Sequence, residues 1–146
     1  MLDDEIPAMI DHLGWRLWRA ARLWKIEFDS RMQAAGHGWF TEARSALLAH
    51  VGAKGARQSD LVTRMGLSKQ AVQQMVDELQ AEGIVTRQPD NSDARAKLVV
   101  LTRKGVAAAR AANEVKRAIE AESRARLGAP TFQALIAALR QLAPDP

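Results

Sequence analysis

The sequence predicts a mostly α-helical protein with one small β-hairpin. Apolar residues recur at intervals of three and four over most of the 146 residues, which is the spacing of an amphipathic helix. The period changes to that of a strand only in two short runs, 84–87 and 97–102, and the segment between them is polar and rich in turn-forming residues. We therefore expect a helical unit that carries a hairpin, with long helices before and after it.

The composition excludes several classes of protein. The chain has 21 Lys and Arg against 17 Asp and Glu, 47% hydrophobic residues and no cysteine. Without cysteine it has no disulfide framework, no thiolate zinc site and no thiol redox switch. No run approaches the roughly 18 apolar residues of a membrane span, and residues 1–5 are acidic where a signal peptide needs a basic start. We expect a cytoplasmic protein that does not enter a membrane.

The N-terminal segment predicts one long helix over residues 6–35. Acidic residues before Pro7 favour a helix start, and Gly36 follows the end of the helix. One apolar stripe comprises Ile6, Ile10, Leu13, Leu17, Ala21, Trp24 and Phe28. Other apolar residues lie off that stripe, namely Met9, Trp15, Trp18 and Leu23. A helix that is apolar on more than one face must be covered on more than one side, and in a chain this small we expect the second side to belong to another subunit.

Three shorter helices are expected before the hairpin. Thr41 is a predicted N-cap for a helix over 43–51, and a short helix follows over 58–64. Ser68 caps a third helix, which ends just before Gly83. The apolar residues of this third helix recur at helical spacing, so one of its faces is buried and the other faces solvent.

The rest of the chain predicts a turn and two further helices. Segment 88–96 is the expected turn between the two strands. An alanine-rich helix is expected over 103–127, and Gly128–Pro130 separate it from a last amphipathic helix over 131–142. The expected organisation is an N-terminal dimerisation helix (1–38), a central unit (39–104) and C-terminal dimerisation helices (105–146).

The excess positive charge lies in the middle of the chain. Between Arg44 and Lys104 there are ten Lys and Arg against six Asp and Glu, and the rest of the chain is neutral. A basic surplus confined to one segment indicates a polyanion partner, although a chance imbalance explains the charge count equally well.

The order of helix, short helix, tight turn, helix and hairpin is that of a winged helix-turn-helix. Its second helix buries one face and offers the other to the major groove of DNA, where Gln pairs with adenine and Ser or Lys reaches phosphates. Basic residues of the hairpin suit the DNA backbone or the minor groove. The candidate DNA-binding residues are Ser68, Lys69, Gln70, Gln73, Gln74, Arg87, Arg95 and Lys97. The alternative is that these are ordinary solvated side chains.

Residues 90–105 resemble the wing signature of the MarR family of transcriptional regulators, in which Asp-x-Arg-Asp-x-Arg precedes a strand and Leu-Thr-x-x-Gly. The resemblance extends over the preceding helix and nearly the whole chain. It implies that Arg95 contacts DNA at the wing tip and that Asp93 helps to hold the shape of the wing. Ser92 stands where the family usually carries its first arginine, so we expect weaker phosphate contact there.

The resemblance also implies a homodimer, joined through the terminal helices, that binds a pseudo-palindromic DNA site and commonly acts as a repressor. Many members release DNA when a small aromatic or phenolic ligand binds. The candidate pocket residues in this chain are Trp15, Arg16, Trp18, Trp39 and Phe40. Such a pocket suits an anionic ring compound, whereas for any single tryptophan a packed dimer core is the stronger interpretation.

No enzyme, cofactor or metal site is expected. The sequence lacks the common phosphate-binding and catalytic motifs, and its three histidines are far apart with no cysteine to help them. The alternative function is a winged-helix protein–protein interaction module with little or no DNA binding. The basic segment argues against that alternative, and Ser92 argues for it.

Overall fold

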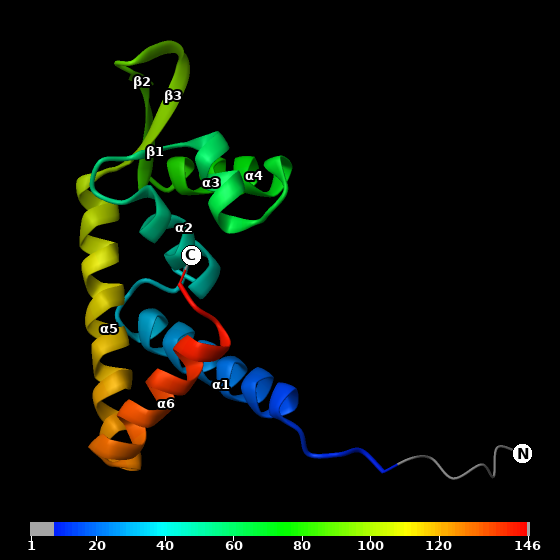
Figure 1. Ribbon diagram of the computed structural model, residues 1–146. Coiled ribbons are helices and arrows are strands. Elements are labelled where there is room, and N and C mark those ends of the chain that lie inside the picture. The colour runs from blue at the N-terminus through cyan, green and yellow to red at the C-terminus, as the bar shows by residue number, and fades with distance from the viewer. Residues whose placement is uncertain (1–7, 146) are drawn as a thin grey trace, which may run out of the picture.

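The computed structural model describes residues 8–145 and is mostly helical with a small sheet (Figure 1). The elements are α1 (Leu13–Ala34), α2 (Glu42–Val51), β1 (Ala56–Arg57), α3 (Gln58–Met65), α4 (Lys69–Ala81), β2 (Val85–Asp90), β3 (Asp93–Leu101), α5 (Arg103–Leu127) and α6 (Ala129–Leu142). The predicted fold class, a winged helix-turn-helix flanked by long terminal helices, is confirmed.

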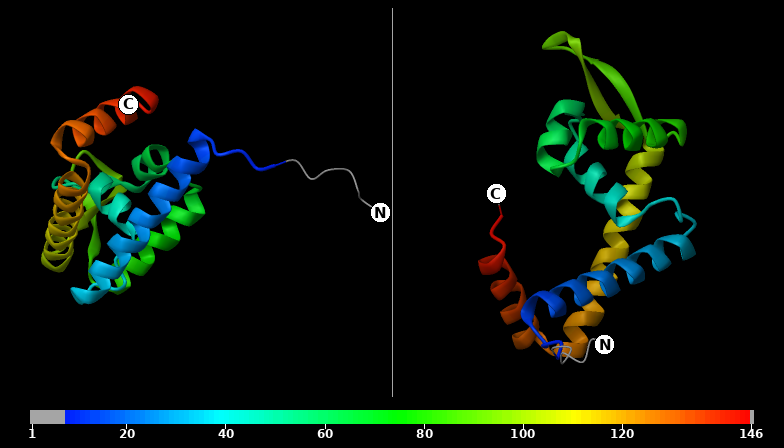
Figure 2. Two further views of the ribbon diagram at one scale, coloured as in Figure 1. Left: turned by 90° about the horizontal axis from the view of Figure 1, so that it is seen from below. Right: turned by 90° about the vertical axis from the view of Figure 1, so that its right-hand side faces the viewer.

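The long helix α5 runs along one side of the molecule, and the other elements are arranged along it (Figure 1). The helices α2, α3 and α4 and the sheet lie around one end of α5, whereas α1 and α6 lie at its other end. Figure 2 shows α1 crossing α5 and α6 folding back from the far end of α5. The hairpin therefore projects from the opposite end of the molecule to the two terminal helices.

The sheet has three antiparallel strands in the order β1-β3-β2. The strands β2 and β3 form the wing, and they extend to Asp90 opposite Asp93. The short β1 pairs Ala56 with Val99 on the other edge of β3. Because α3 follows β1 directly, this pairing fixes the start of α3 to the base of the wing.

One apolar core joins the central unit to α5 and to the second half of α1. Helix α4 buries Val72, Val76 and Leu79, which belong to the apolar face that its spacing predicts. Helix α1 buries only Phe28 and Met32, and every side chain of residues 8–27 is exposed. The first four turns of α1 thus carry apolar side chains that residues 8–145 leave exposed to a large degree.

Helix α4 ends where the sequence predicts, at a Schellman motif. The N–H of Gly83 donates to the carbonyl of Gln80 at 3.0 Å, and the N–H of Ile84 donates to that of Leu79 at 2.9 Å. Gly83 has a φ of 73°, a left-handed conformation that favours glycine. The motif stops the helix and turns the chain into β2.

The N-terminal helix begins later than predicted. Residues 8–12 are not helical, and α1 starts at Leu13 with His12 as its N-cap. The Nδ1 atom of His12 accepts a hydrogen bond from the N–H of Trp15 at 3.4 Å. The predicted start, before Pro7, lies outside the described residues. Helical spacing of apolar residues up to Ile10 misled the prediction, because it indicates which residues share a face and not where a helix is capped.

The wing differs from its prediction in two ways. Only Asn91 and Ser92 lie between the two strands, so the predicted turn over 88–96 is wrong, because most of that segment is strand. The wing projects beyond the core, both of its faces meet water, and its residues therefore lack the alternation that marks a half-buried strand. The two-residue β1 is too short to show any period and was not predicted. Helix α6 begins at 129, with Pro130 in its first turn, where proline is tolerated.

Candidate nucleic-acid interface

Helix α4 presents a polar face on the side away from the core. The exposed residues of this face are Lys69, Gln70, Gln73 and Gln74. At the start of the helix the Oγ atom of Ser68 accepts from the N–H of Ala71 at 3.0 Å, so Ser68 is the predicted N-cap and its hydroxyl proton can still be donated. Lys69 and Gln70 make no side-chain hydrogen bond to any other residue between 8 and 145, which leaves both available to a ligand.

The two later glutamines are oriented by carboxylates on the next turn of the helix. The Nε2 atom of Gln73 donates to both oxygens of Asp77 at 3.0 Å, and its Oε1 accepts from Gln58 of α3. The Nε2 atom of Gln74 donates to Oε1 of Glu78 at 3.1 Å. A base contact by either amide must therefore replace or extend a hydrogen bond that already exists.

Arg87 of β2 is turned towards α4. Its Nη2 lies 2.7 Å from Oδ1 of Asp77, its Nη1 donates to Gln80 at 2.5 Å, and its side chain is only 17% exposed. The pKa of Asp77 is lowered, first by the Gln73 amide and then by the Arg87 guanidinium. Arg87 thus offsets a negative charge beside the exposed face of α4, and its direct contact with DNA stays a prediction.

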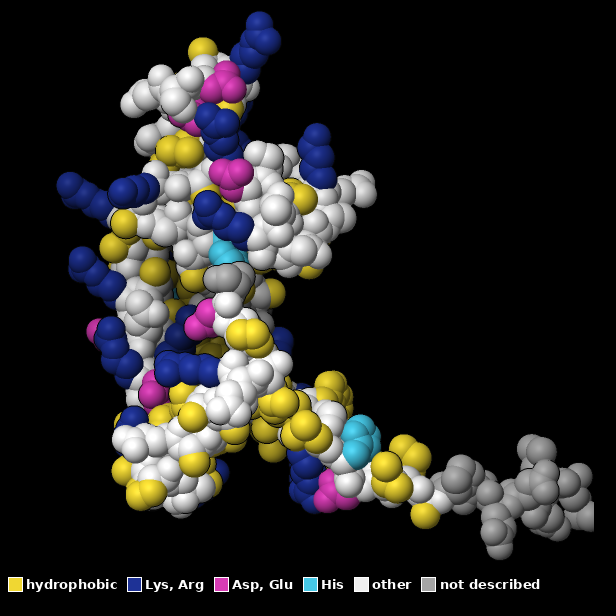
Figure 3. All heavy atoms as spheres, in the orientation of Figure 1, with side chains coloured by type: hydrophobic (Ala, Val, Ile, Leu, Met, Phe, Trp, Pro, Cys, Tyr) yellow, Lys and Arg dark blue, Asp and Glu magenta, His cyan; other side chains and the backbone are white. Residues whose placement is uncertain are grey.

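Arg95 and Lys97 are exposed on β3, in the outer part of the wing. The Oδ1 atom of Asp93 accepts from the backbone N–H of Arg95 at 3.0 Å, which fixes the backbone that carries Arg95. Figure 3 shows Lys and Arg side chains on the wing and along the flank formed by α5. This geometry suits the roles in DNA contact and wing shape that the resemblance implies for Arg95 and Asp93.

The turn of the wing is held by Asp90, Ser92 and Arg57. The Oδ2 atom of Asp90 accepts from Nε of Arg57 at 2.7 Å, and Nη2 of Arg57 reaches Oγ of Ser92 at 3.1 Å. The pKa of Asp90 is lowered to about 2, chiefly by the Ser92 hydroxyl, then by the Ser92 backbone N–H and by Arg57. Sequence reasoning missed Arg57, because nothing in a sequence marks a partner 33 residues away.

The structure does not bring the five predicted pocket residues together in one subunit. Trp15 and Trp18 stack at 5.1 Å near the start of α1, where Arg16 is ion-paired with a neighbouring aspartate. Trp39 and Phe40 follow the other end of α1, about 30 Å away along a helix of this length. Phe40 is also only 1% exposed, so it is a core residue.

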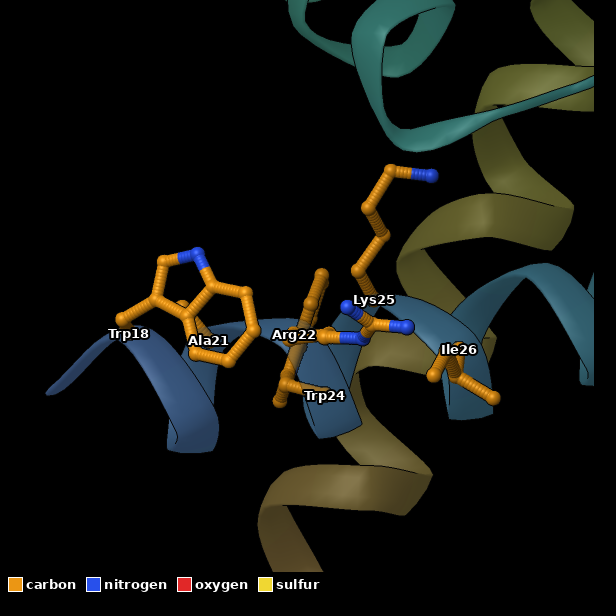
Figure 4. Close-up of a pocket in the computed structure, with 6 residues that line it drawn as sticks. All are labelled: Trp18, Ala21, Arg22, Trp24, Lys25 and Ile26. Carbon is orange, nitrogen blue, oxygen red and sulfur yellow. The ribbon is translucent and has the colours of Figure 1, made fainter. Parts of the chain in front are cut away.

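An open groove with similar chemistry lies along α1 (Figure 4). Its lining residues are Trp18, Ala21, Arg22, Trp24, Lys25 and Ile26. The Arg22 guanidinium carbon lies 5.3 Å from the centre of the Trp18 ring, a cation–π distance. The groove combines aromatic and cationic groups, as the predicted pocket does, but on an exposed helix face.

Neither a metal-ligating cluster nor a membrane-spanning helix is present in the described part of the chain. Residues 8–145 contain no group of three or more His, Asp or Glu side chains that could hold an ion. Over the same residues no helix is both long and apolar enough to cross a membrane.

Together these elements define a class of protein. A short helix and a tight turn lead into α4, whose polar face is exposed beside a two-stranded wing that carries cations, and this is a winged helix-turn-helix. Residues 40–96 match the model of the MarR family. The central unit is thus similar to the winged helix-turn-helix of the MarR family, and nearly the whole chain has the fold of solved MarR structures.

Solved structures resemble nearly the whole chain. A probable transcriptional regulator from Pseudomonas aeruginosa is 26% identical, with 97% of this chain and 99% of that chain covered and a TM-score of 0.73. The transcriptional repressor CouR bound to a 23-mer DNA duplex is 24% identical, with 93% and 99% covered and a TM-score of 0.78. A variant of E. coli MarR complexed with operator DNA is 22% identical, with 90% and 94% covered and a TM-score of 0.76. No curated protein sequence matches the chain. These relatives are regulators, which agrees with the prediction that the chain is not an enzyme.

Proposed function

We propose that this protein is a homodimeric transcription regulator that binds double-stranded DNA through α4 and the wing. The observation that carries the proposal is the exposed polar face of α4, with Lys69 and Gln70 open at its N-terminal end, beside a wing that exposes Arg95 and Lys97. A helix of this kind fits the major groove, and wing cations suit the backbone or minor groove. Similar folds have been solved on DNA, which supports the proposal.

The dimer is inferred from apolar side chains that one subunit leaves uncovered. They lie on α1 and α6, at the end of the molecule opposite to the wing, and the most exposed are Leu13, Trp15, Trp18, Leu23, Ile26, Leu135 and Leu142. An exposed apolar surface of this extent marks an interaction site. A two-fold partner through these helices would present two α4 helices to half-sites about 35 Å apart, and therefore to a pseudo-palindromic operator.

Repression relieved by a small ligand is the proposed mode of action. A regulator that occupies its operator only without ligand represses, and CouR, a similar protein, is named a repressor. The aromatic and cationic groove on α1, with Trp18 and Arg22, supports an anionic aromatic ligand held between subunits. Addition of aromatic carboxylates to the dimer is expected to quench tryptophan fluorescence and to weaken DNA binding. If a broad set of aromatic carboxylates neither quenches the fluorescence nor weakens DNA binding, the proposal of control by an aromatic ligand is refuted.

DNA binding is tested with a labelled duplex that spans the DNA upstream of the protein's own gene. We expect binding that weakens steeply with salt, and at least tenfold weaker binding by Arg95→Ala. Arg117→Ala is the matched control, because it removes an exposed arginine from α5, well away from the wing, and we expect it to bind like the parent protein.

The alternative is a winged-helix protein–protein interaction module. If no upstream duplex binds even at low salt, DNA recognition is refuted and the interaction module becomes the better interpretation. If Arg95→Ala and Arg117→Ala lose the same affinity, binding reflects only net charge and the assignment of the wing is wrong.

A further inference from the structure

Arg44, in the first turn of α2, joins three parts of the molecule. Its Nη1 donates to the backbone carbonyl of Trp39 at 2.9 Å and to Oε1 of Glu82 at 3.0 Å. Its Nη2 donates to Oε2 of Glu78 at 2.9 Å. The Arg44 side chain is only 18% exposed, so these bonds are partly shielded from water. One guanidinium thus contacts the loop between α1 and α2 and the C-terminal end of α4.

The C-terminal end of α4 needs a cation that its own sequence does not provide. Glu78 and Glu82 lie at the negative end of the helix dipole, where carboxylates are unfavourable, and the last turn holds no basic residue. Arg44 reaches both carboxylates from α2. Arg44 therefore links α4 to α2, and Lys104 of α5 adds a second cation there by donating to the Glu82 carbonyl at 2.9 Å.

Glu78 connects Arg44 to the exposed polar face of α4. Glu78 uses Oε2 for Arg44 and Oε1 for the Nε2 atom of Gln74 at 3.1 Å. Gln74 belongs to the polar face proposed to read DNA. One carboxylate therefore separates the Arg44 guanidinium from a side chain of that face.

At its other end Arg44 holds a loop that packs on α1. The Trp39 ring meets the Phe40 ring edge-on at 5.2 Å, and Phe40 lies 6.5 Å from Phe28 of α1. Phe28 and Phe40 are both buried, so a shift of α1 against the central unit moves this aromatic cluster and, with it, the Trp39 carbonyl.

We propose that Arg44 is a positioning residue that couples the loop between α1 and α2 to the DNA-reading face of α4, through Trp39 on one side and Glu78 on the other. The proposal rests on the proposed function as a DNA-binding regulator. Coupling between two sites is reciprocal, so DNA bound on α4 must change the environment of Trp39, and that change must depend on Arg44.

The experiment uses the full-length protein labelled with 5-fluorotryptophan, with the Trp39 resonance assigned by Trp39→Phe. The fluorine spectrum is followed while the upstream duplex is added. We expect the Trp39 resonance to shift on DNA binding in the parent protein. In Arg44→Met the duplex binds roughly tenfold more weakly, and at saturation the Trp39 resonance does not shift. The control Arg64→Met removes an exposed arginine from α3 whose hydrogen bond goes to the carbonyl of His50 in α2, and its Trp39 resonance shifts as in the parent.

The possible outcomes separate the two proposals. If the parent protein binds no duplex, DNA binding itself fails. If DNA binds without a shift of Trp39, or if Arg44→Met shows the full shift, the coupling role of Arg44 is overturned. Should Arg44→Met not fold, Glu78→Gln replaces it, because it removes the ion pair with Glu78 and leaves the Arg44 bonds to Glu82 and to the Trp39 carbonyl in place. A full Trp39 shift in Glu78→Gln would equally refute the path through Glu78.

Discussion

Ser92 closes the turn of the wing on Asp90. Its backbone N–H and its hydroxyl both donate to Oδ1 of Asp90, at 2.9 and 2.7 Å. The position where related wings usually carry an arginine is therefore used here to shape the turn. The carboxylate, which these bonds and Arg57 stabilise in its charged form, is the group whose pKa falls to about 2.

Ser92→Ala is expected to raise the pKa of Asp90 towards the ordinary value of about 3.9, because the hydroxyl bond is the largest cause of its depression. A carboxyl whose folded pKa is depressed contributes stability above its unfolded pKa, and that contribution is lost as the pH falls through the folded pKa. The stability difference between the parent and Ser92→Ala should therefore be full at neutral pH and shrink between about pH 4 and pH 2. Carboxyl titration by NMR and thermal melts at each pH measure this. Ser59→Ala, an exposed serine on α3, is the control, and equal titration of Asp90 in all three proteins would contradict the assignment.

Ser92→Arg restores a cation to the turn of the wing. If the wing lies on phosphates, the slope of log affinity against log salt concentration should steepen by about 0.9 for each wing. Ser92→Gln removes the same hydroxyl without adding charge, so it isolates the effect of the cation. We expect Ser92→Gln to keep the parent slope. An unchanged slope in Ser92→Arg, measured by fluorescence anisotropy over a range of salt, would place the turn away from DNA.

The charge on Asp77 gives a way to distinguish two roles of Arg87. If Arg87 only offsets Asp77, Arg87→Met leaves a negative charge beside the DNA-reading face and weakens binding by about tenfold, or roughly 1.4 kcal/mol. The double variant Arg87→Met/Asp77→Asn then recovers most of the affinity. If Arg87 contacts a phosphate itself, the second substitution does not restore binding. Titration of the upstream duplex with the four proteins of this double-mutant cycle decides between the two roles.

The helical part of the fold could be predicted from the sequence because local signals mark it. Helix α5 runs over 103–127 as predicted, since Thr102 caps its first turn and Gly128 follows its last. The N-cap roles of Thr41 and Ser68 are likewise visible in the residue types. Such signals act over three or four residues and need no knowledge of the rest of the chain.

The contacts that arrange the candidate site could not be predicted, because they join residues far apart in the sequence. Arg57 reaches Asp90 over 33 positions, and Arg44 reaches Glu82 over 38. In the sequence alone, charged residues at these positions cannot be distinguished from ordinary solvated surface charges, because their partners are known only from the fold. The exposed polar face of α4 could be predicted from the residue types of that helix alone, whereas the partners that orient Gln73 could not.

The apolar surface of α6 gives a direct test of the dimer. Leu139 is 37% exposed, and Leu135 and Leu142 lie on the same side of the helix and are more exposed. Fully burying an exposed leucine contributes about 1.5–3 kcal/mol, of which a partner supplies only the share still exposed, and a two-fold interface uses each residue twice. Leu139→Glu would bury two carboxylates in that interface, so we expect monomers at micromolar concentration in sedimentation velocity. Gln133→Glu adds the same charge to an exposed position on another side of α6 and should leave the dimer intact.

A monomer offers one α4 to a pseudo-palindrome, so Leu139→Glu should also lose most of the affinity for the upstream duplex. A Leu139→Glu protein that sediments as the parent does would place the dimer interface elsewhere.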